Sequence, residues 1–310
     1  MDKKILHVVL GMLFILTGCS SNQNDDIKPE NGFDRKAMLE NLADHIIIPG
    51  YDSFKQRFDV MQTTSEDFLN APSLIGLQEF RSAWKEAYIE WQKVELFDVG
   101  PAQEATLRTH FNIYPFNVAE AEANITLGIY NLDEVRQIAT QGFPAIDYFL
   151  NGTGADDAAI LAWFNDPAMT TNRKKYVRDV VGKMNEKLQA VVNEWAGSYR
   201  STFINNAGTD AASSTGKLVN AYILHYERFV RSGKVGIPAG IIGSSLIDPA
   251  PEKVEAFYQR DLSKELALTA QQAVLDFYRG KSFNSTSTGP SFKSYFTALG
   301  VTGSDGRLLA

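Results

Sequence analysis

Carboxylates offer the first candidate chemistry in this sequence. Glu90 and Glu95 stand five residues apart in a stretch rich in aromatic side chains. Two neighbouring carboxylates can hold a metal ion or pass a proton between them. Paired carboxylates on a helix are more often solvated surface groups, so this pair predicts a site only if another feature supports it.

Histidines are few, and their spacing argues against a zinc site. Those beyond residue 18 are His45, His110 and His225. No two lie three or four residues apart and none stands in an HExxH pattern, so one helix cannot present two ring nitrogens to zinc. We expect His225 to be a packed or hydrogen-bonded side chain rather than a ligand, and His110 to be exposed in a loop.

Nucleophile and phosphate motifs are absent from the sequence. There is no GxSxG elbow, and Gly216-Lys217-Leu218 and Gly233-Lys234-Val235-Gly236 lack the remaining residues of a phosphate-binding loop. The glycines from Gly233 onward predict an irregular loop that extends to Pro251. Serine hydrolase and nucleotide-binding functions are therefore not indicated.

Cys19 is the only cysteine, and its surroundings indicate lipidation rather than catalysis. Two lysines precede the apolar run Ile5 to Leu16, which suits a secretory signal and is too short to span a bilayer. Leu16-Thr17-Gly18-Cys19 resembles a bacterial lipobox. We therefore predict a lipoprotein signal peptide over residues 1–18 and a lipid on Cys19, which anchors the chain to a membrane.

The polar segment that follows predicts a flexible tether over residues 19–33, because it has almost no apolar side chains to bury. Asp25-Asp26 resembles an acidic surface-export signal. We expect the outer membrane, with the protein on its periplasmic or its surface face. The net charge of −7 becomes more negative once the lysine-bearing signal is removed, so the composition does not predict nucleic-acid binding.

The elements that position these residues are predicted to be helices. Apolar side chains recur at steps of three and four over residues 77–91, 176–199, 218–230 and 254–278. Pro72 is expected at the start of the first of these. Shorter helices are expected around 34–48, 52–69, 116–127 and 156–164. The pattern predicts an all-α fold of packed bundles over residues 34–310, with approximate halves 34–205 and 214–310.

Several stretches, in the same order, resemble imelysin-like proteins. They are Trp84 to Phe97, Asn112 to Pro115, Gln141 to Gly152, Gly233 to Pro238 and Val254 to Tyr258. The resemblance implies two packed helical bundles in a secreted or lipid-anchored bacterial protein. Some members of that family are described as metallopeptidases, and others are linked to iron or haem acquisition. Because the family usually continues into further helices, the second bundle is expected to be small or truncated here.

The family signature, Gly-x-His-x-x-Glu, is altered in this chain. The matching residues are Gly142, Pro144 and Asp147, so the signature histidine is replaced by a proline that offers no donor atom. Asp147 keeps a carboxylate on a shorter side chain, and Glu95 matches the acidic residue that closes the family's aromatic helix. The resemblance makes Asp147 and Glu95 candidate ligands for a divalent metal ion or iron.

Three functions follow from these features. The first is a non-catalytic envelope protein that binds haem, iron or an envelope partner. The second is a metallopeptidase, which requires three protein ligands to the metal and a general base. The third is a structural protein of the envelope. The replacement of the histidine by Pro144 favours the first.

Overall fold

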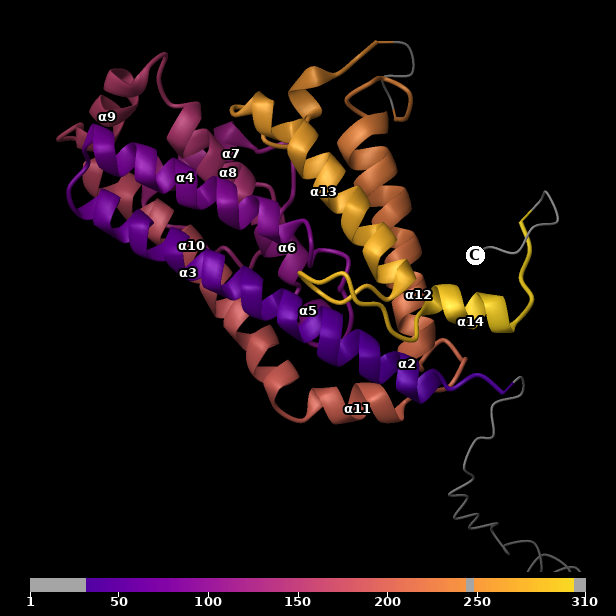
Figure 1. The fold of residues 1–310 in the computed structure, drawn as a ribbon. Helices are drawn as coiled ribbons and strands as arrows, with labels where there is room; N and C mark the ends of the chain where they lie inside the picture. Colours follow the sequence, from indigo (N-terminus) through magenta and orange to yellow (C-terminus); the bar gives the residue numbers. More distant parts are fainter. Residues whose placement is uncertain (1–31, 244–247, 304–310) are drawn as a thin grey trace, which may run out of the picture. The chain divides into compact units, whose positions relative to one another are not determined.

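Helices make up most of the computed structural model (Figure 1), which describes residues 32–243 and 248–303. The predicted all-α class is confirmed: the described ranges contain no β-strand, and an isolated bridge joins Lys281 to Thr288. None of the helices described has the length and apolar character needed to span a bilayer. The predicted signal peptide, Cys19 and residues 20–31 of the tether lie outside the described ranges.

Three long helices form the core of the first bundle. They are α3 (Ile48–Asn70), α4 (Leu74–Trp91) and α10 (Thr170–Ala196), and α3 packs against the other two. The predicted break between helices 34–48 and 52–69 is wrong. Instead α2 (Arg35–Leu42) continues through a π-helical turn, η1 (Ala43–Ile47), into α3. Pro49, in the first turn of α3, has no N–H to donate, and the His45 carbonyl four residues earlier accepts a hydrogen bond from the Phe283 backbone N–H instead.

Helix α4 buries the predicted apolar face, on which Phe80, Trp84, Tyr88 and Trp91 form an aromatic stripe. Its N-cap is Ser73, whose side chain accepts a hydrogen bond from the Gly76 backbone N–H, so Pro72 precedes the cap instead of starting the helix. Rings from two shorter helices stack on the stripe, Phe143 on Tyr88 with centroids 4.3 Å apart and Phe111 on Trp91 at 4.9 Å. These stacks fix the shorter helices against α4.

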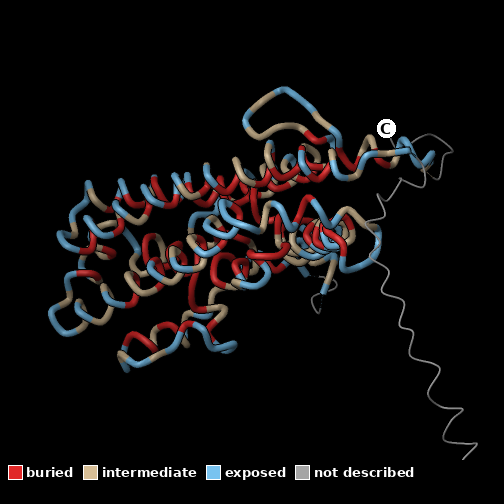
Figure 2. Tube along the Cα trace, turned by 90° about the horizontal axis from the view of Figure 1, so that it is seen from below, coloured by how far each residue is buried: buried red, intermediate tan, exposed pale blue. Residues whose placement is uncertain are grey.

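Shorter helices, most of which pack against α10, complete this part of the fold. They are α5 (Pro101–Glu104), α6 (Leu107–Phe111), α7 (Val118–Leu127), η2 (Val135–Gln137), α8 (Gly142–Asn151), α9 (Asp157–Asn165) and α11 (Tyr199–Asn205). Residues 142–150 of α8 are all buried. Figure 2 shows buried residues lining the inner faces of the packed helices.

The second group of helices begins with α12 (Ser214–Leu224), which continues without interruption into the π-helical segment η3 (His225–Gly236). The predicted loop from Gly233 is therefore wrong at its start. After the short turn η4 (Pro251–Lys253), α13 (Arg260–Arg279) runs beside α12 and η3 (Figure 1), and α14 (Phe292–Ala298) follows. The predicted helix over 254–278 thus begins six residues late, after an irregular turn.

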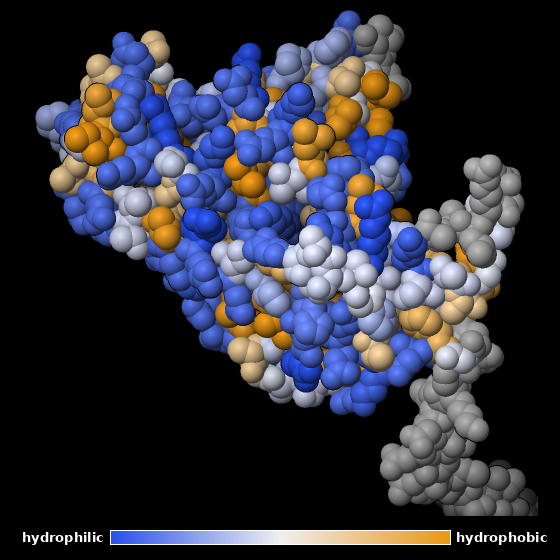
Figure 3. All heavy atoms as spheres, viewed as in Figure 1, coloured by the Kyte–Doolittle hydropathy of each residue, from blue (hydrophilic) through white to orange (hydrophobic). Residues whose placement is uncertain are grey.

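Residues from Asp34 onward belong to one unit, in which α13 packs against both η3 and α4. Its surface is largely hydrophilic with scattered apolar patches (Figure 3). Among the described residues, the large apolar side chains exposed on α12 and α13 are Ile223 (55% exposed), Leu224 and Leu268 (61% exposed). The division into halves 34–205 and 214–310 stays a prediction.

Candidate functional site

A cluster of buried charges forms where η3 and the turn before α13 meet the first bundle. The Lys234 ammonium nitrogen lies 2.6 Å from Glu255 Oε2 and 3.8 Å from Glu95 Oε2. None of these three side chains is more than a few per cent exposed. One lysine therefore offsets two carboxylates in a place where water cannot solvate them.

Arg108, on α6, supplies the second cation of this cluster. Its Nε lies 3.6 Å from Glu95 Oε1, while its terminal nitrogens donate to the Glu95 carbonyl and to Asp98, each at 2.7 Å. The guanidinium also lies over the ring of Phe229, 4.0 Å from its centroid. Burial raises the pKa of Glu95, and the two neighbouring cations, Lys234 and Arg108, oppose that rise.

Neutral side chains complete the hydrogen bonding of Glu255. Asn112 Nδ2 donates to Glu255 Oε1 at 2.7 Å and Gln92 Nε2 donates to the same oxygen at 3.0 Å. The Tyr88 hydroxyl in turn donates to Asn112 Oδ1 at 2.6 Å, which fixes the orientation of that amide. With these donors and Lys234, the carboxylate of Glu255 is well satisfied in the buried cluster.

The two histidines of this region behave differently from one another. His225 is fully buried and lies beside the ring of Phe229, in agreement with the prediction that it is a packed side chain. Neither of its ring nitrogens has a hydrogen-bond partner within the described residues. Burial lowers the pKa of His225, and Arg108 and Lys234 lower it further, so the ring is neutral. The prediction that His110 is exposed is wrong, because α6 buries it and its Nδ1 contacts the Thr106 carbonyl.

Asp147, the acidic residue of the altered signature, lies on α8 and is 1% exposed. Its Oδ1 accepts a hydrogen bond from Asn151 Nδ2 at 3.0 Å, and its Oδ2 accepts one from the Tyr258 backbone N–H at 2.9 Å. Burial raises the pKa of Asp147 to about 7, although these donors and the Gln259 backbone N–H favour the ionised form. Asp147 therefore joins α8 to the turn before α13.

The turn over residues 254–259 connects the two parts of the site. It places Glu255 in the buried cluster and the Tyr258 N–H on Asp147. Between them, Ala256 adopts a positive φ of 54°, which an L-residue rarely does. Because apolar residues over 254–278 have helical spacing, the sequence gives no sign of this turn, and Glu255 was not predicted as a site residue.

Gly142 is needed at the start of α8 for steric reasons. Its φ is +79°, and an added Cβ would lie 2.3 Å from the Phe111 carbonyl oxygen and 3.0 Å from that of His110. This close approach of backbones brings α6 and α8 together beneath the aromatic stripe. Backbone packing therefore requires the signature glycine, whether or not the signature histidine is present.

We expect Gly142→Ala to lower the free energy of unfolding by about 2–3 kcal/mol, because the methyl group meets backbone atoms and φ becomes unfavourable. Urea denaturation followed by circular dichroism measures the loss. Gly182→Ala is the matched control, since an added Cβ at that position in α10 meets no atom within 4 Å. Equal stability of the two variants would contradict the steric explanation.

The predicted carboxylates are thus held by separate sets of partners. Glu95 belongs to the charged cluster, Asp147 is bonded to Asn151 and Tyr258, and Glu90 is paired with Lys93 at 2.7 Å. Among the described residues, no three histidine, cysteine, aspartate or glutamate side chains are grouped as metal ligands would be. With Pro144 offering no donor, this set does not fit a catalytic metal centre, which needs three protein ligands. Metal binding by Asp147 and Glu95 stays a prediction.

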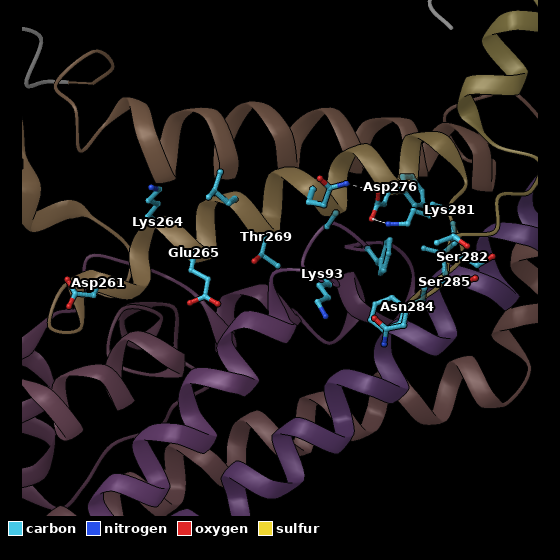
Figure 4. Close-up of a pocket in the computed structure, with 18 residues that line it drawn as sticks. Lys93, Asp261, Lys264, Glu265, Thr269, Asp276, Lys281, Ser282, Asn284 and Ser285 are labelled. Carbon is cyan, nitrogen blue, oxygen red and sulfur yellow. Dashed lines mark hydrogen bonds and ion pairs between the residues drawn. The ribbon is translucent and has the colours of Figure 1, made fainter.

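Two hollows adjoin this region. A cavity of about 250 Å³ has Asp147 and Pro144 in its wall, facing the turn that carries Tyr258. A larger open groove of about 1110 Å³ runs along α13, and Figure 4 shows side chains from that helix and Lys93 pointing into it. Phe97, Phe277 and Phe283 also line the groove, among alternating acidic and basic side chains. No residue of the groove was predicted to form a binding site, because the segments that line it are far apart in the sequence.

Comparisons with known proteins agree on one family. The sequence profile of the imelysin family, Peptidase_M75, matches residues 47–299. The chain is 20% identical over 256 residues to iron-regulated protein A of Synechococcus elongatus, a match that covers 81% of this chain and 66% of that protein. The chain therefore spans slightly less than two thirds of the length of this relative.

Solved structures show the same fold. A protein assigned as an iron-regulated protein A precursor from Parabacteroides distasonis superposes with a TM-score of 0.66 at 17% identity, covering 85% of this chain and 79% of that one. An imelysin-like protein from Psychrobacter arcticum gives a TM-score of 0.55 at 17% identity, covering 78% and 73%. The predicted resemblance and the packed helical bundles are confirmed.

Proposed function

Because this chain belongs to the imelysin family, we propose that it is a lipid-anchored protein of the bacterial cell envelope that binds a ligand or partner in iron or haem uptake, without catalysis. The link to iron comes from relatives that carry the name iron-regulated protein A. The anchor comes from the lipobox-like sequence that ends at Cys19. The contacts that the carboxylates of the site make support the non-catalytic part of the proposal.

The partners of the buried carboxylates are the observation that supports a non-catalytic role. A metallopeptidase needs open ligands for its metal and a base that can take a proton from water. Here Glu95 and Glu255 are offset by Lys234 and Arg108, and Asp147 accepts hydrogen bonds from Asn151 and from backbone. These contacts stabilise the packing of η3 and the 254–259 turn on the first bundle, as expected for a structural core.

The groove along α13 offers a binding surface outside this core. Its volume of about 1110 Å³ exceeds the usual range for a drug-sized ligand and suits a larger molecule or a segment of a protein. Aromatic floor residues with a mixed charged rim are typical of protein-binding surfaces. We assign ligand or partner binding to this groove, where Lys264 and Leu268 are exposed.

The test is binding by the full-length protein in detergent. Haem is titrated and followed by its absorbance, ferric citrate is titrated and followed by iron analysis, and envelope proteins that co-purify are identified by mass spectrometry. We expect haem, iron or a specific envelope partner to bind, and Leu268→Asp to weaken that binding at least tenfold, while Leu299→Asp on another surface does not. Failure of all three kinds of binding, or peptide cleavage that a chelator stops, would overturn the proposal.

The anchor has its own test. We expect the wild-type chain, expressed in a bacterium that processes lipoproteins, to incorporate an alkyne-labelled palmitate and to sediment with membranes. Cys19→Ser should lose both, because several acyl chains are needed for stable membrane attachment and this cysteine carries them. Label that persists in Cys19→Ser would disprove the anchor. Protease treatment of intact cells then distinguishes the surface face from the periplasmic face.

A further inference from the structure

The small cavity beside Asp147 has walls formed mainly by aromatic rings. Tyr114 and Phe116 lie on one side, and Phe257 and Tyr258, from the turn before α13, lie on the other. Phe257 and Tyr258 meet nearly at right angles, with an interplanar angle of 77° and centroids 5.0 Å apart. This is an edge-to-face pair, in which the edge of one ring meets the face of the other. An aromatic face that remains free at such a cavity would attract a cation.

Charge in the cavity is of one sign. Asp147 lies buried in the wall and Glu252 is exposed at the edge, while none of the lining residues in the described part of the chain is basic. An anion would meet repulsion here without a compensating donor. A cation would gain from both carboxylates as well as from the rings.

A metal ion fits these walls less well than an organic cation does. Mg²⁺ and Ca²⁺ require six or more oxygen ligands, and both oxygens of Asp147 already accept N–H hydrogen bonds. The remaining lining is proline, valine, alanine and aromatic carbon, which cannot replace water around a small, strongly hydrated ion. A weakly hydrated cation covered with methyl groups loses little on entry.

One of these rings already carries a cation of the protein itself, so the ligand must use the other rings. The Arg260 guanidinium lies 4.5 Å from the centroid of Phe257. Pro144, in the position of the signature histidine, adds an apolar surface where a ring nitrogen would otherwise compete for hydrogen bonds. At about 250 Å³ the cavity is smaller than a drug-sized site, so the ligand must be small.

We propose that this cavity binds a small organic cation of the quaternary or tertiary ammonium class, held by the rings of Phe116 and Tyr258 and by the carboxylates of Asp147 and Glu252. This goes beyond the proposed role in iron or haem uptake and does not depend on it. The cavity and the groove along α13 are lined by different residues, so binding at each can be measured independently.

The experiment is calorimetric titration of the full-length protein with choline and with 3,3-dimethyl-1-butanol, which has the same shape without the charge. We expect choline to bind at one site, at least tenfold more tightly than the neutral alcohol. Phe116→Leu and Glu252→Gln should each weaken choline at least threefold. The matched controls Phe296→Leu and Glu79→Gln, a half-buried ring on α14 and an exposed acid on α4, should not.

Three results would overturn the proposal. They are no heat with choline, equal affinity for choline and the alcohol, and choline binding that is unchanged in the variants. Glu252 is exposed, so Glu252→Gln remains folded and informative even if loss of the Phe116 ring disturbs packing. A negative result with choline would not contradict binding of haem, iron or a partner at the groove. A negative result at the groove would likewise not contradict choline binding in the cavity.

Discussion

Lys234→Met should lower the free energy of unfolding at pH 7 by about 3–5 kcal/mol, since it breaks a buried ion pair and strands the remaining charge. The side chains have similar volume, so the loss is electrostatic. Without the ammonium group, Glu255 and Glu95 face one another with only Arg108 to offset them. Urea denaturation, monitored by tryptophan fluorescence, measures the change.

The double variant Lys234→Met with Glu255→Gln separates charge from packing. It removes one positive and one negative charge together, and the amide oxygen introduced by Glu255→Gln can still accept hydrogen bonds from Asn112 and Gln92. We expect it to recover more than half of the loss, because replacing both members of a buried pair costs far less than removing one. Lys217→Met, at an exposed position of α12, controls for the loss of a lysine elsewhere and should be nearly neutral.

The result decides what the cluster does. A large loss that the second substitution repairs means that Lys234 neutralises the buried carboxylates as a structural element. A loss below about 1 kcal/mol is the size expected of exposed pairs and would mean that water reaches the cluster, so that Glu95 and Glu255 are available for other chemistry. That second outcome would weaken the argument for a non-catalytic site.

The long helices could be predicted from the sequence because their signal is local and repeated. In α10 the predicted apolar face is buried at Tyr176, Val180, Met184 and Leu188, each a turn or so from the last. A long amphipathic helix is stable only when its apolar face is buried, so the pattern predicts both the helix and the face that packs against the core. The family resemblance then supplied the arrangement of the bundles.

The charged cluster could not be predicted in the same way. Lys234, Glu255 and Arg108 come from three separate segments, and no local spacing links them. Lys234 lies among glycines that indicated a loop, whereas the chain continues there as the π-helical segment η3. Glu255 follows a helical pattern of apolar residues but lies in a turn. Such π-helical segments are rare, so sequence propensity does not predict them, and they often occur near functional sites.

The residues of the altered signature share one helix, but the sequence does not show what they contact. Gly142, Pro144 and Asp147 do lie together on α8 at the join with the turn before α13. The sequence shows that a nitrogen donor is lost, but not that Asp147 is bonded to Asn151 and to the Tyr258 backbone. That bonding depends on the positive φ of Ala256, which a sequence pattern does not reveal.

Asp147→Asn should change the pH dependence of stability strongly. Burial raises the pKa of Asp147 to about 7 from its ordinary value of 3.8. The folded state therefore holds its proton more tightly than the unfolded state does. The contribution of Asp147 to the free energy of unfolding is therefore greatest below pH 4, falls as the pH rises toward 7, and levels off above it.

Asparagine stays neutral throughout this range, so the variant lacks that fall. Relative to wild type, its free energy of unfolding should improve by about 4 kcal/mol between pH 4 and pH 8, at up to about 1.4 kcal/mol per pH unit. Its Oδ1 can still accept from the Tyr258 N–H, and Asn151 can turn its amide oxygen toward the new NH₂. Urea titrations at several pH values give the difference directly, because other titrating groups cancel.

Asp52→Asn, at an exposed position of α3, is the matched control for replacing a carboxylate by an amide. If the Asp147→Asn curve runs parallel to wild type, Asp147 is ionised in the folded protein across the whole range. Its three N–H donors would then outweigh its burial, and the join between α8 and the 254–259 turn would be held by a permanent charge. A steep difference means instead that this join loosens as the pH rises through neutrality, which makes Asp147 the residue through which pH acts on the site.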